Sequence, residues 1–578
     1  MPAHMHSFNQ NSGRRLVASF QPAYRLFLLI SLVTGRFCLS APFLPVDSVK
    51  PGMKGFGLSV FTGTRIDTFQ VEVLDVMKKI SPRGDLILCR LSGAGLENSG
   101  VIAGMSGSPV YINDKLLGAV AYAWSWAKEP IAGVTPIQEM LDIWQAQSGS
   151  RPRSRAPRSN LPHLPIPIAI SGLNPELEQL LTPTLAALGM KPVAGASNSG
   201  TTDTTGFVPG GVIGVALIDG DVRAAAVGTI TYREGNRILA FGHPFFQGGD
   251  VQLPMTGGVI HSILPSFATS FKLFSPGPPI GTVTQDRAPG IAGTIGTVPP
   301  MLPVRVVVNS PKTRDTYNFR IAIHEQLTPE FMPIALAEAV LQTEGTLEEV
   351  TLNSRLLLRF TDGTTAQIRH TFAGINPVVA LLENTRNELQ FLFANDIKPV
   401  ALETVEAIIN ITPGRTSAEL IAAVPERTWV HPGETLAIYL EIRDYRGTET
   451  EQIVRIPIPA TTPPGIINVT LTSAAEFLHQ QIQRLPRLAN PTSLTQLLKL
   501  LEDSGREDEL IVAGFLTQPA LALGEREMPN PPPSILQIFS SSKKGGRTQP
   551  VPNSLLFKIP VKLNRVIQGS VSFDLEVK

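Results

Sequence analysis

Short runs of apolar residues, many of them alternating with polar ones, recur in two parts of the chain. Across residues 49–144 they are separated by Gly, Pro or Asn-Asp turn signals, and they read FGLSVFTG, FQVEVLDV, DLILCRL, SPVYI and LLGAVAYAW. A second block of this kind covers residues 206–308. Runs of this length between turn residues are typical of β-strands. The pattern predicts a mainly β protein in which 42–145 and 206–308 each form an antiparallel barrel or sandwich and pack against each other.

Helical periodicity is confined to a few segments. Thr135, Pro136 and Gln138 fit the cap, first and third positions of a capping box, which predicts a short helix capped by Thr135. Longer helices are predicted at 174–189, 327–344 and 471–505. A hairpin is predicted at 354–372.

These patterns divide the chain into seven regions. The linker between the two β halves contains SGSRPRSRAPRSNLP, whose arginines and lack of apolar residues do not favour an ordered element. The regions are 1–41, an export signal or leader; 42–145, a serine-bearing β half; 146–205, a linker and helical segment; 206–308, a histidine-bearing β half; 309–400, an α/β segment; 401–470, a β-sandwich-like domain; and 471–578, a helical segment, a loop and closing strands.

The N-terminal region has the features of an export signal. Arg14, Arg15 and Arg25 precede an apolar run over 26–35, which is too short to cross a bilayer as a helix. We expect the protein to be exported to the periplasm, the cell envelope or the medium, without its first ~40 residues and with no remaining transmembrane span. A retained amphipathic leader is the alternative, and N-terminal sequencing of the recovered protein distinguishes the two.

Composition excludes several classes of function. The formal net charge is only +1, so a polycationic face for nucleic acid is not indicated. No HExxH or Cys-x-x-Cys motif occurs, so no metal or redox cofactor is expected. Cys89 lies in the apolar run DLILCRL and is predicted to be a buried structural thiol. It would be the only cysteine left after removal of the leader, so no internal disulfide is expected.

The hexapeptide GMSGSP at 104–109 carries candidate catalytic chemistry. A serine nucleophile needs a tight turn that exposes its hydroxyl and directs backbone N–H groups at the developing oxyanion, and glycines permit such a turn. Ser106 is the candidate nucleophile, and the N–H groups of Gly104 and Ser106 are the candidate oxyanion donors. The alternative is a glycine-rich hairpin containing small polar residues. Ser108 is the nearest rival, but it precedes Pro109 and has no glycine directly after it.

Two histidines of the β halves are candidates for the general base. His243 follows an apolar strand in RILAFGHPFFQGG and precedes Pro244, which places it at a strand end facing a loop. His261 lies within an alternating run, which favours a structural role.

Three aromatic residues alternate near the end of the first β half. Tyr122, Trp124 and Trp126 would share one face of a strand. Core packing is the expected role for them, and a wall facing the substrate is the alternative.

These residues carry a resemblance to a known family. VIAGMSGSPVYINDKLLGAVAYAW and PIAGVTPIQEML resemble the serine end of the bacterial stage IV B sporulation (SpoIVB-type) peptidases, and AVGTITYREGNRILAFGHP with IGTVTQDRAPGIAGTIG resembles their histidine segment. The resemblance implies a secreted or envelope serine endopeptidase related to the chymotrypsin-like double β-barrel. It implies Ser106 as nucleophile, His243 as general base, and a protein or peptide as substrate.

The chain departs from the family pattern in three respects. The serine segment precedes the histidine segment, as in a circular permutation, no PDZ-like module is visible, and the family's aspartate before the serine motif has no counterpart. A base histidine normally needs a third group to orient it. Asp286 is the candidate, because it lies 43 residues after His243, close to the roughly 45 in chymotrypsin's order. Asp250 or no carboxylate at all are the alternatives.

Two classes of function therefore remain open. The first is a serine endopeptidase acting on proteins outside the cytoplasm. The second is a catalytically silent relative that binds peptides or partner proteins of the cell envelope as a scaffold.

Overall fold

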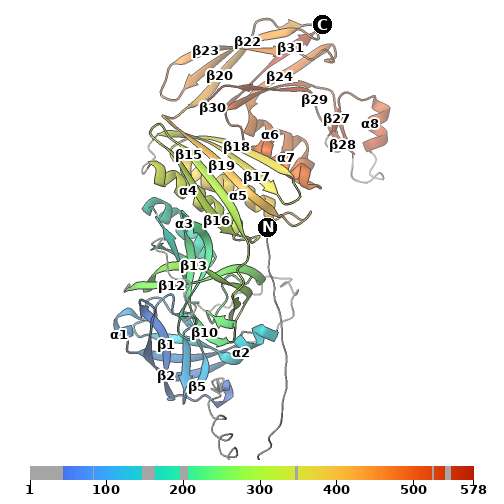
Figure 1. Ribbon diagram of the computed structural model, residues 1–578. Helices are drawn as coiled ribbons and strands as arrows, with labels where there is room; N and C mark the ends of the chain where they lie inside the picture. The colour runs from blue at the N-terminus through green and yellow to red at the C-terminus, as the bar shows by residue number, and fades with distance from the viewer. Residues whose placement is uncertain are drawn as a thin grey trace, which may run out of the picture. The chain divides into compact units, whose positions relative to one another are not determined.

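The computed structural model describes most of the chain beyond the leader (Figure 1). The predicted export signal and the linker over 146–162 lie outside the described residues. Within the described part, no helix is long and apolar enough to cross a membrane. The described residues are 43–81, 84–145, 163–172, 174–195, 206–344, 349–523, 526–540 and 548–578.

The serine-bearing half is a closed barrel of six antiparallel strands. Alternation determines its interior: Phe69, Val71 and Val73 on β2 are buried, whereas Gln70 between them is exposed. The strands pair in the closed order β1-β2-β3-β6-β5-β4. Their bounds are β1 (Lys54–Thr62), β2 (Arg65–Ser81), β3 (Gly84–Ser92), β4 (Pro109–Ile112), β5 (Lys115–Ala123) and β6 (Ile131–Pro136).

The histidine-bearing half is a second ring with the same strand order. Its pairings run β9-β10-β11-β14-β13-β12, and β12 pairs with β9 again and closes the ring. If the six strands of each half are numbered in chain order, their order around the ring is therefore first, second, third, sixth, fifth and fourth in both halves. The bounds are β9 (Val212–Gly220), β10 (Ala224–Glu234), β11 (Arg237–Ala240), β12 (Gly249–Leu264), β13 (Phe271–Arg287) and β14 (Gly290–Ile295). The mainly β architecture predicted from the sequence is confirmed.

The serine turn itself joins the two halves. The Thr229 N–H donates to the Ser106 carbonyl oxygen at 2.8 Å. The Thr229 hydroxyl donates to the Gly104 carbonyl at 3.0 Å, and the Thr231 hydroxyl donates to the Gly107 carbonyl at 2.7 Å. Buried hydrogen bonds of this kind fix the register of two surfaces, because any displacement leaves their polar groups unpaired. The two halves pack against each other as the sequence predicts.

Gly107 is required at this contact for two reasons. Its φ is +94°, and a Cβ there would lie 2.0 Å from the Thr229 carbonyl oxygen and 2.5 Å from the Phe241 amide nitrogen. We expect Gly107→Ala to lower the free energy of unfolding of the two halves by about 2–4 kcal/mol, from left-handed strain and overpacking together. Denaturant titration measures it.

The matched control is Gly52→Ala, which has a similar φ of +84° but no atom within 4 Å of the added methyl group. It should cost only about 1 kcal/mol from backbone strain. Equal losses for the two variants would show that close packing at Gly107 contributes nothing.

The second ring continues on both sides into a thirteen-stranded sheet. On one side β10 pairs with β7, and β7 pairs with β8. On the other, β9 pairs with β16, and the order continues through β15, β19, β17 and β18. The predicted hairpin is β17–β18, and the predicted helices at 174–189 and 327–344 are α3 and α4. The bounds are β7 (Ile166–Ser171), α3 (Pro175–Ala187), β8 (Met190–Gly195), β15 (Met301–Asn309), β16 (Arg314–Ala322), α4 (Thr328–Glu344), β17 (Val350–Phe360), β18 (Thr365–Ala373), α5 (Pro377–Phe393) and β19 (Leu402–Pro413).

The C-terminal part differs from the predicted sandwich over 401–470. Strand β19 belongs to the large sheet, where it pairs in parallel with β15. The remaining strands of this region share one core with strands from the end of the chain, in two sheets ordered β23-β22-β20-β30 and β21-β31-β24-β25-β29. The sequence pattern identifies the strands but not their long-range partners.

Further elements complete this part. The two helices α6 and α7 fall within the predicted helical segment at 471–505, and a small sheet is ordered β27-β26-β28. The bounds are β20 (Ser417–Pro425), β21 (Trp429–Val430), β22 (Thr435–Asp444), β23 (Glu449–Pro457), β24 (Gly465–Ser473), α6 (Ala474–Arg484), α7 (Leu494–Ser504), β25 (Glu509–Leu516), β26 (Ala520–Leu523), β27 (Arg526–Met528), α8 (Pro533–Ser540), β28 (Thr548–Val551), β29 (Ser554–Lys562), β30 (Val566–Gln568) and β31 (Ser570–Val577).

Candidate active site

Ser106 lies between β3 and β4, in a turn held by backbone hydrogen bonds within the turn and to β5. The N–H groups of Met105, Gly107 and Ser108 donate to backbone carbonyls at 2.7–2.9 Å. Those of Gly104 and Ser106 donate to no partner among the described residues. Two unpaired N–H groups on either side of Met105 are therefore available to an oxygen atom of a ligand, as an oxyanion hole requires.

His243 occupies the equivalent place in the second ring, between β11 and β12. The two residues before it, Phe241 and Gly242, both have φ of +69°. A buried phenylalanine in this conformation is strained, and such strain persists where the surrounding structure holds it in place. Here the Thr135 hydroxyl of the serine half donates to the Gly242 carbonyl at 2.6 Å. The prediction of Thr135 as a helix cap is wrong: α2 (Ile137–Leu141) begins after Pro136, and the hydroxyl instead holds the histidine loop.

Backbone hydrogen bonds bring the two residues to one junction. Thr229 links them, because its N–H donates to the Ser106 carbonyl at 2.8 Å and its carbonyl accepts from the Phe241 N–H at 3.3 Å. Ser106 and His243 are each only 1% exposed. Their reactive atoms, Ser106 Oγ and His243 Nε2, have no hydrogen-bond partner in the described part of the chain and are not bonded to each other. Buried unpaired polar atoms are costly and call for a functional explanation.

The tautomer of His243 suits a general base. Its Nδ1 lies 2.8 Å from the Pro244 carbonyl oxygen, which can only accept, so Nδ1 carries the proton and Nε2 has a free lone pair. Burial, and next the neighbouring His163, lower the pKa of His243 to about 3. The imidazole is therefore neutral at physiological pH.

Asp286 supports the histidine loop and does not contact the imidazole. It lies at the end of β13, and its carboxylate accepts the N–H groups of Phe245, Phe246 and Gly248 at 2.7–2.9 Å. Burial raises the pKa of Asp286, and these N–H groups oppose that shift. The other candidate, Asp250, pairs with Arg287 at 2.6 Å. The group that accepts the hydrogen bond of the imidazole N–H and orients the ring is thus the Pro244 carbonyl. Asp286 instead holds the backbone of the loop that follows Pro244.

We expect Asp286→Asn to lower the proposed peptidase activity by about 10–100-fold, because an amide presents its own N–H₂ to the loop's donors and displaces the loop that carries His243. The loss should be smaller than for His243→Ala. Asp250→Asn, on the paired strand, is the matched control and should stay within about twofold of wild type. An unchanged rate for Asp286→Asn would contradict the positioning role.

A buried lysine behind the serine turn was missed by sequence reasoning. The Lys272 ammonium is fully buried and donates to Ser59 Oγ at 3.0 Å, and Ser108 Oγ donates to the same oxygen at 3.1 Å. Burial lowers the pKa of Lys272 to about 7. Its stem packs on Gly104, where an added Cβ would lie 3.0 Å from Lys272 Cδ. The sequence feature that could have indicated this residue is the single lysine in the apolar run SFKLF. Through Ser59, the ammonium belongs to the same buried hydrogen-bond network as the Ser108 hydroxyl.

A second missed residue is His163, which the sequence assigns to the linker. Its ring centroid lies 5.4 Å from that of His243 and 4.9 Å from that of Tyr122. His261, by contrast, bonds Ser275 at 2.7 Å across the β12–β13 hairpin, as a structural histidine would.

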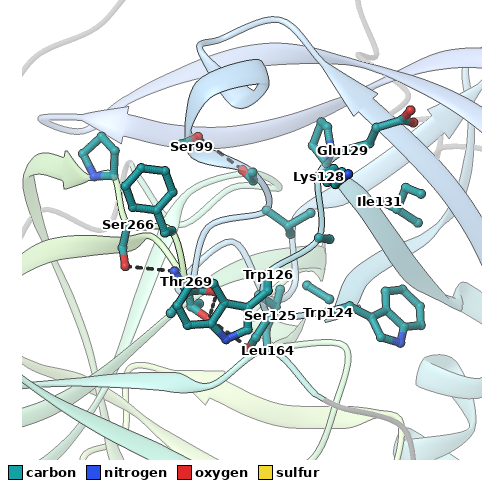
Figure 2. A pocket seen from close by; sticks show the side chains of 18 of the residues that line it. Ser99, Trp124, Ser125, Trp126, Lys128, Glu129, Ile131, Leu164, Ser266 and Thr269 are labelled. Carbon is teal, nitrogen blue, oxygen red and sulfur yellow. Dashed lines mark hydrogen bonds between the residues drawn. The ribbon is translucent and has the colours of Figure 1, made fainter.

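A cavity of about 410 Å³ lies beside Leu164 and Pro165, which follow His163 in the chain, and neither Ser106 nor His243 lines it (Figure 2). Trp124, Trp126 and Leu164 line it, together with residues 97–101 and 265–269. Core packing is thus the wrong prediction for Trp126, which is 72% exposed beyond the end of β5. Among the described residues, no group of three or more His, Cys, Asp or Glu side chains is placed to hold a metal ion.

Two six-stranded β rings thus meet at a glycine-flanked serine and a neutral histidine. The model of the SpoIVB peptidase S55 family matches residues 45–141. This match, which covers the serine half alone, supports the predicted resemblance to the SpoIVB-type family and points to a serine peptidase. No curated protein and no solved structure matches the chain. His243 lies outside the matched residues, so its family role and the permuted order stay predictions.

Proposed function

We propose that the protein is a serine endopeptidase that cleaves protein substrates outside the cytoplasm, with Ser106 as nucleophile and His243 as general base. The observation that carries the proposal is the pair of buried reactive atoms, Ser106 Oγ and His243 Nε2, which lack partners in the described structure and lie at equivalent places in two rings joined by the serine turn. The family match over 45–141 supports the class of reaction.

The chemistry follows from the roles of these groups. His243 Nε2 accepts the Ser106 hydroxyl proton while Oγ attacks the scissile carbonyl carbon. The carbonyl oxygen becomes negative and accepts the N–H groups of Gly104 and Ser106. The tetrahedral intermediate then collapses, the imidazolium gives its proton to the leaving amine, and an acyl-enzyme forms. Water, deprotonated by the same Nε2, releases the acid and restores the hydroxyl.

The second candidate is a catalytically silent peptide-binding or scaffold protein of the envelope. Two observations favour it: Ser106 Oγ and His243 Nε2 are not hydrogen-bonded to each other, and neither Asp286 nor Asp250 reaches the imidazole.

A fluorophosphonate probe tests the proposal, because it reacts only with an activated serine and requires no knowledge of the substrate. We expect the purified protein to be labelled once per chain and to hydrolyse an unfolded protein such as casein. Absence of both reactions, in protein whose folding is verified, would support the scaffold function.

A further inference from the structure

The chain's own segment His163–Pro165 lies along the edge of β5. The Leu164 N–H donates to the Ala121 carbonyl at 3.1 Å, and His163 pairs with Tyr122 in antiparallel orientation. This is the start of a strand addition, in which main-chain hydrogen bonds hold an extended peptide against an exposed strand.

The same strand holds the serine turn one residue earlier. The Gly107 N–H donates to the Val120 carbonyl at 2.7 Å, and the Val120 N–H donates to the Ser108 carbonyl at 3.0 Å. The segment therefore pairs with the β5 residues that directly follow Val120, whose backbone holds the serine turn.

The side chains of the segment cover the site. The His163 ring packs against both the Tyr122 ring and the His243 ring, and His243 is almost fully buried. Leu164 is 1% exposed and lines the cavity together with Pro165. Figure 2 shows Leu164 at this cavity with Trp124 and Trp126.

We infer that the β5 edge at 121–123 binds the substrate polypeptide as an added antiparallel strand, that the adjoining cavity accepts an apolar side chain of the substrate, and that His163–Leu164 is a self-bound peptide that competes for this site. The inference rests on the proposed function, because it treats Ser106 and His243 as the groups that the segment covers. The substrate class is an extended polypeptide with a leucine-like or aromatic residue. Displacement of the segment exposes His243 and admits the substrate.

The test separates binding from catalysis. A fluorescent peptide with the sequence of residues 159–165, SNLPHLP, is titrated into Ser106→Ala protein with and without Leu164→Gly. We expect at least tenfold tighter binding when Leu164→Gly has weakened the internal segment, and no binding of SNLPHDP. In protein with Ser106 intact, Leu164→Gly should raise the rate of fluorophosphonate labelling at least tenfold.

A second variant keeps the test valid if Leu164→Gly is unfolded. Tyr122 and His163 are direct antiparallel partners, and such pairs lie within the Cα separation that a disulfide spans. Tyr122→Cys with His163→Cys should block peptide binding and labelling when oxidised and restore both on reduction. Each single cysteine variant is the control and should not respond to oxidant.

The outcomes distinguish the two claims. One outcome is that Leu164→Gly, or reduction of the engineered disulfide, leaves peptide binding unchanged while the probe still labels the protein. In that case the inference of a self-bound peptide is wrong and the proposed function stands. If peptide binding rises as expected but no form is labelled, the binding site stands and the peptidase function fails.

Discussion

Peptide hydrolysis should fall by about 10³-fold or more in Ser106→Ala and equally in His243→Ala, and the double variant should be no slower than either single variant. The reason is that nucleophile and base act as one unit: without Nε2 the hydroxyl keeps its proton, and without Oγ the base has nothing to activate. Initial rates on an unfolded protein substrate measure the effect.

Matched controls exclude a general loss of structure. His261→Ala removes a histidine of the same ring that bonds Ser275 in the hairpin, and Ser262→Ala removes an exposed serine of β12 whose hydroxyl donates to the Ile263 carbonyl. Both should retain activity within about threefold. Losses that multiply in the Ser106→Ala, His243→Ala double variant would contradict a shared catalytic step.

His370→Ala should lower the free energy of unfolding by about 3–5 kcal/mol, the range for breaking a buried ion pair from one side. His370 lies on β18 and bonds Glu388 of α5 at 2.6 Å and Glu507, which precedes β25, at 2.7 Å. Its removal leaves the buried Glu388 carboxylate without this partner. Denaturant titration of full-length protein measures the loss, with the exposed His431→Ala as control; equal effects of the two would contradict the role of this cluster.

The same cluster predicts a pH dependence. Burial alone would lower the pKa of His370, but its hydrogen bonds with Glu388 and Glu507 raise it to about 10. A histidine whose folded pKa exceeds its unfolded value of about 6.5 stabilises the fold fully below that value. The contribution then declines as the pH rises toward 10. The stability difference between wild type and His370→Ala should therefore shrink between pH 6.5 and 10, and a difference that grows would contradict the assignment.

The sequence predicts the local elements of both halves well, because alternation and turn residues depend on neighbours in the chain. The strand bearing Phe69, Val71 and Val73 and the serine turn at GMSGSP are local patterns of this kind. Strand partners are not local: no pattern distinguishes β19, which joins the large sheet, from β20, which joins the sandwich.

The site shows the same division between local and long-range information. Ser106 and His243 stand out because glycine and proline beside them specify sharp turns. Asp286 does not stand out in this way, because it accepts hydrogen bonds from the backbone N–H groups of a loop. Any residue other than proline can donate a backbone N–H, so the types of the loop residues do not reveal these bonds. His163 and Lys272 reach the junction only through tertiary packing, so their sequence neighbours give no indication of their partners.

The identity of the nucleophile is the central claim, and the mapped site of a fluorophosphonate adduct tests it most directly. Ser108 is the structural rival, because its hydroxyl belongs to the buried network of Ser59 and Lys272. Wild type, Ser106→Ala and Ser108→Ala are labelled in parallel, and the modified peptide is identified by mass spectrometry. An adduct on Ser106 in wild type and Ser108→Ala, with none in Ser106→Ala, is the predicted result; an adduct on Ser108 that persists in Ser106→Ala would contradict it.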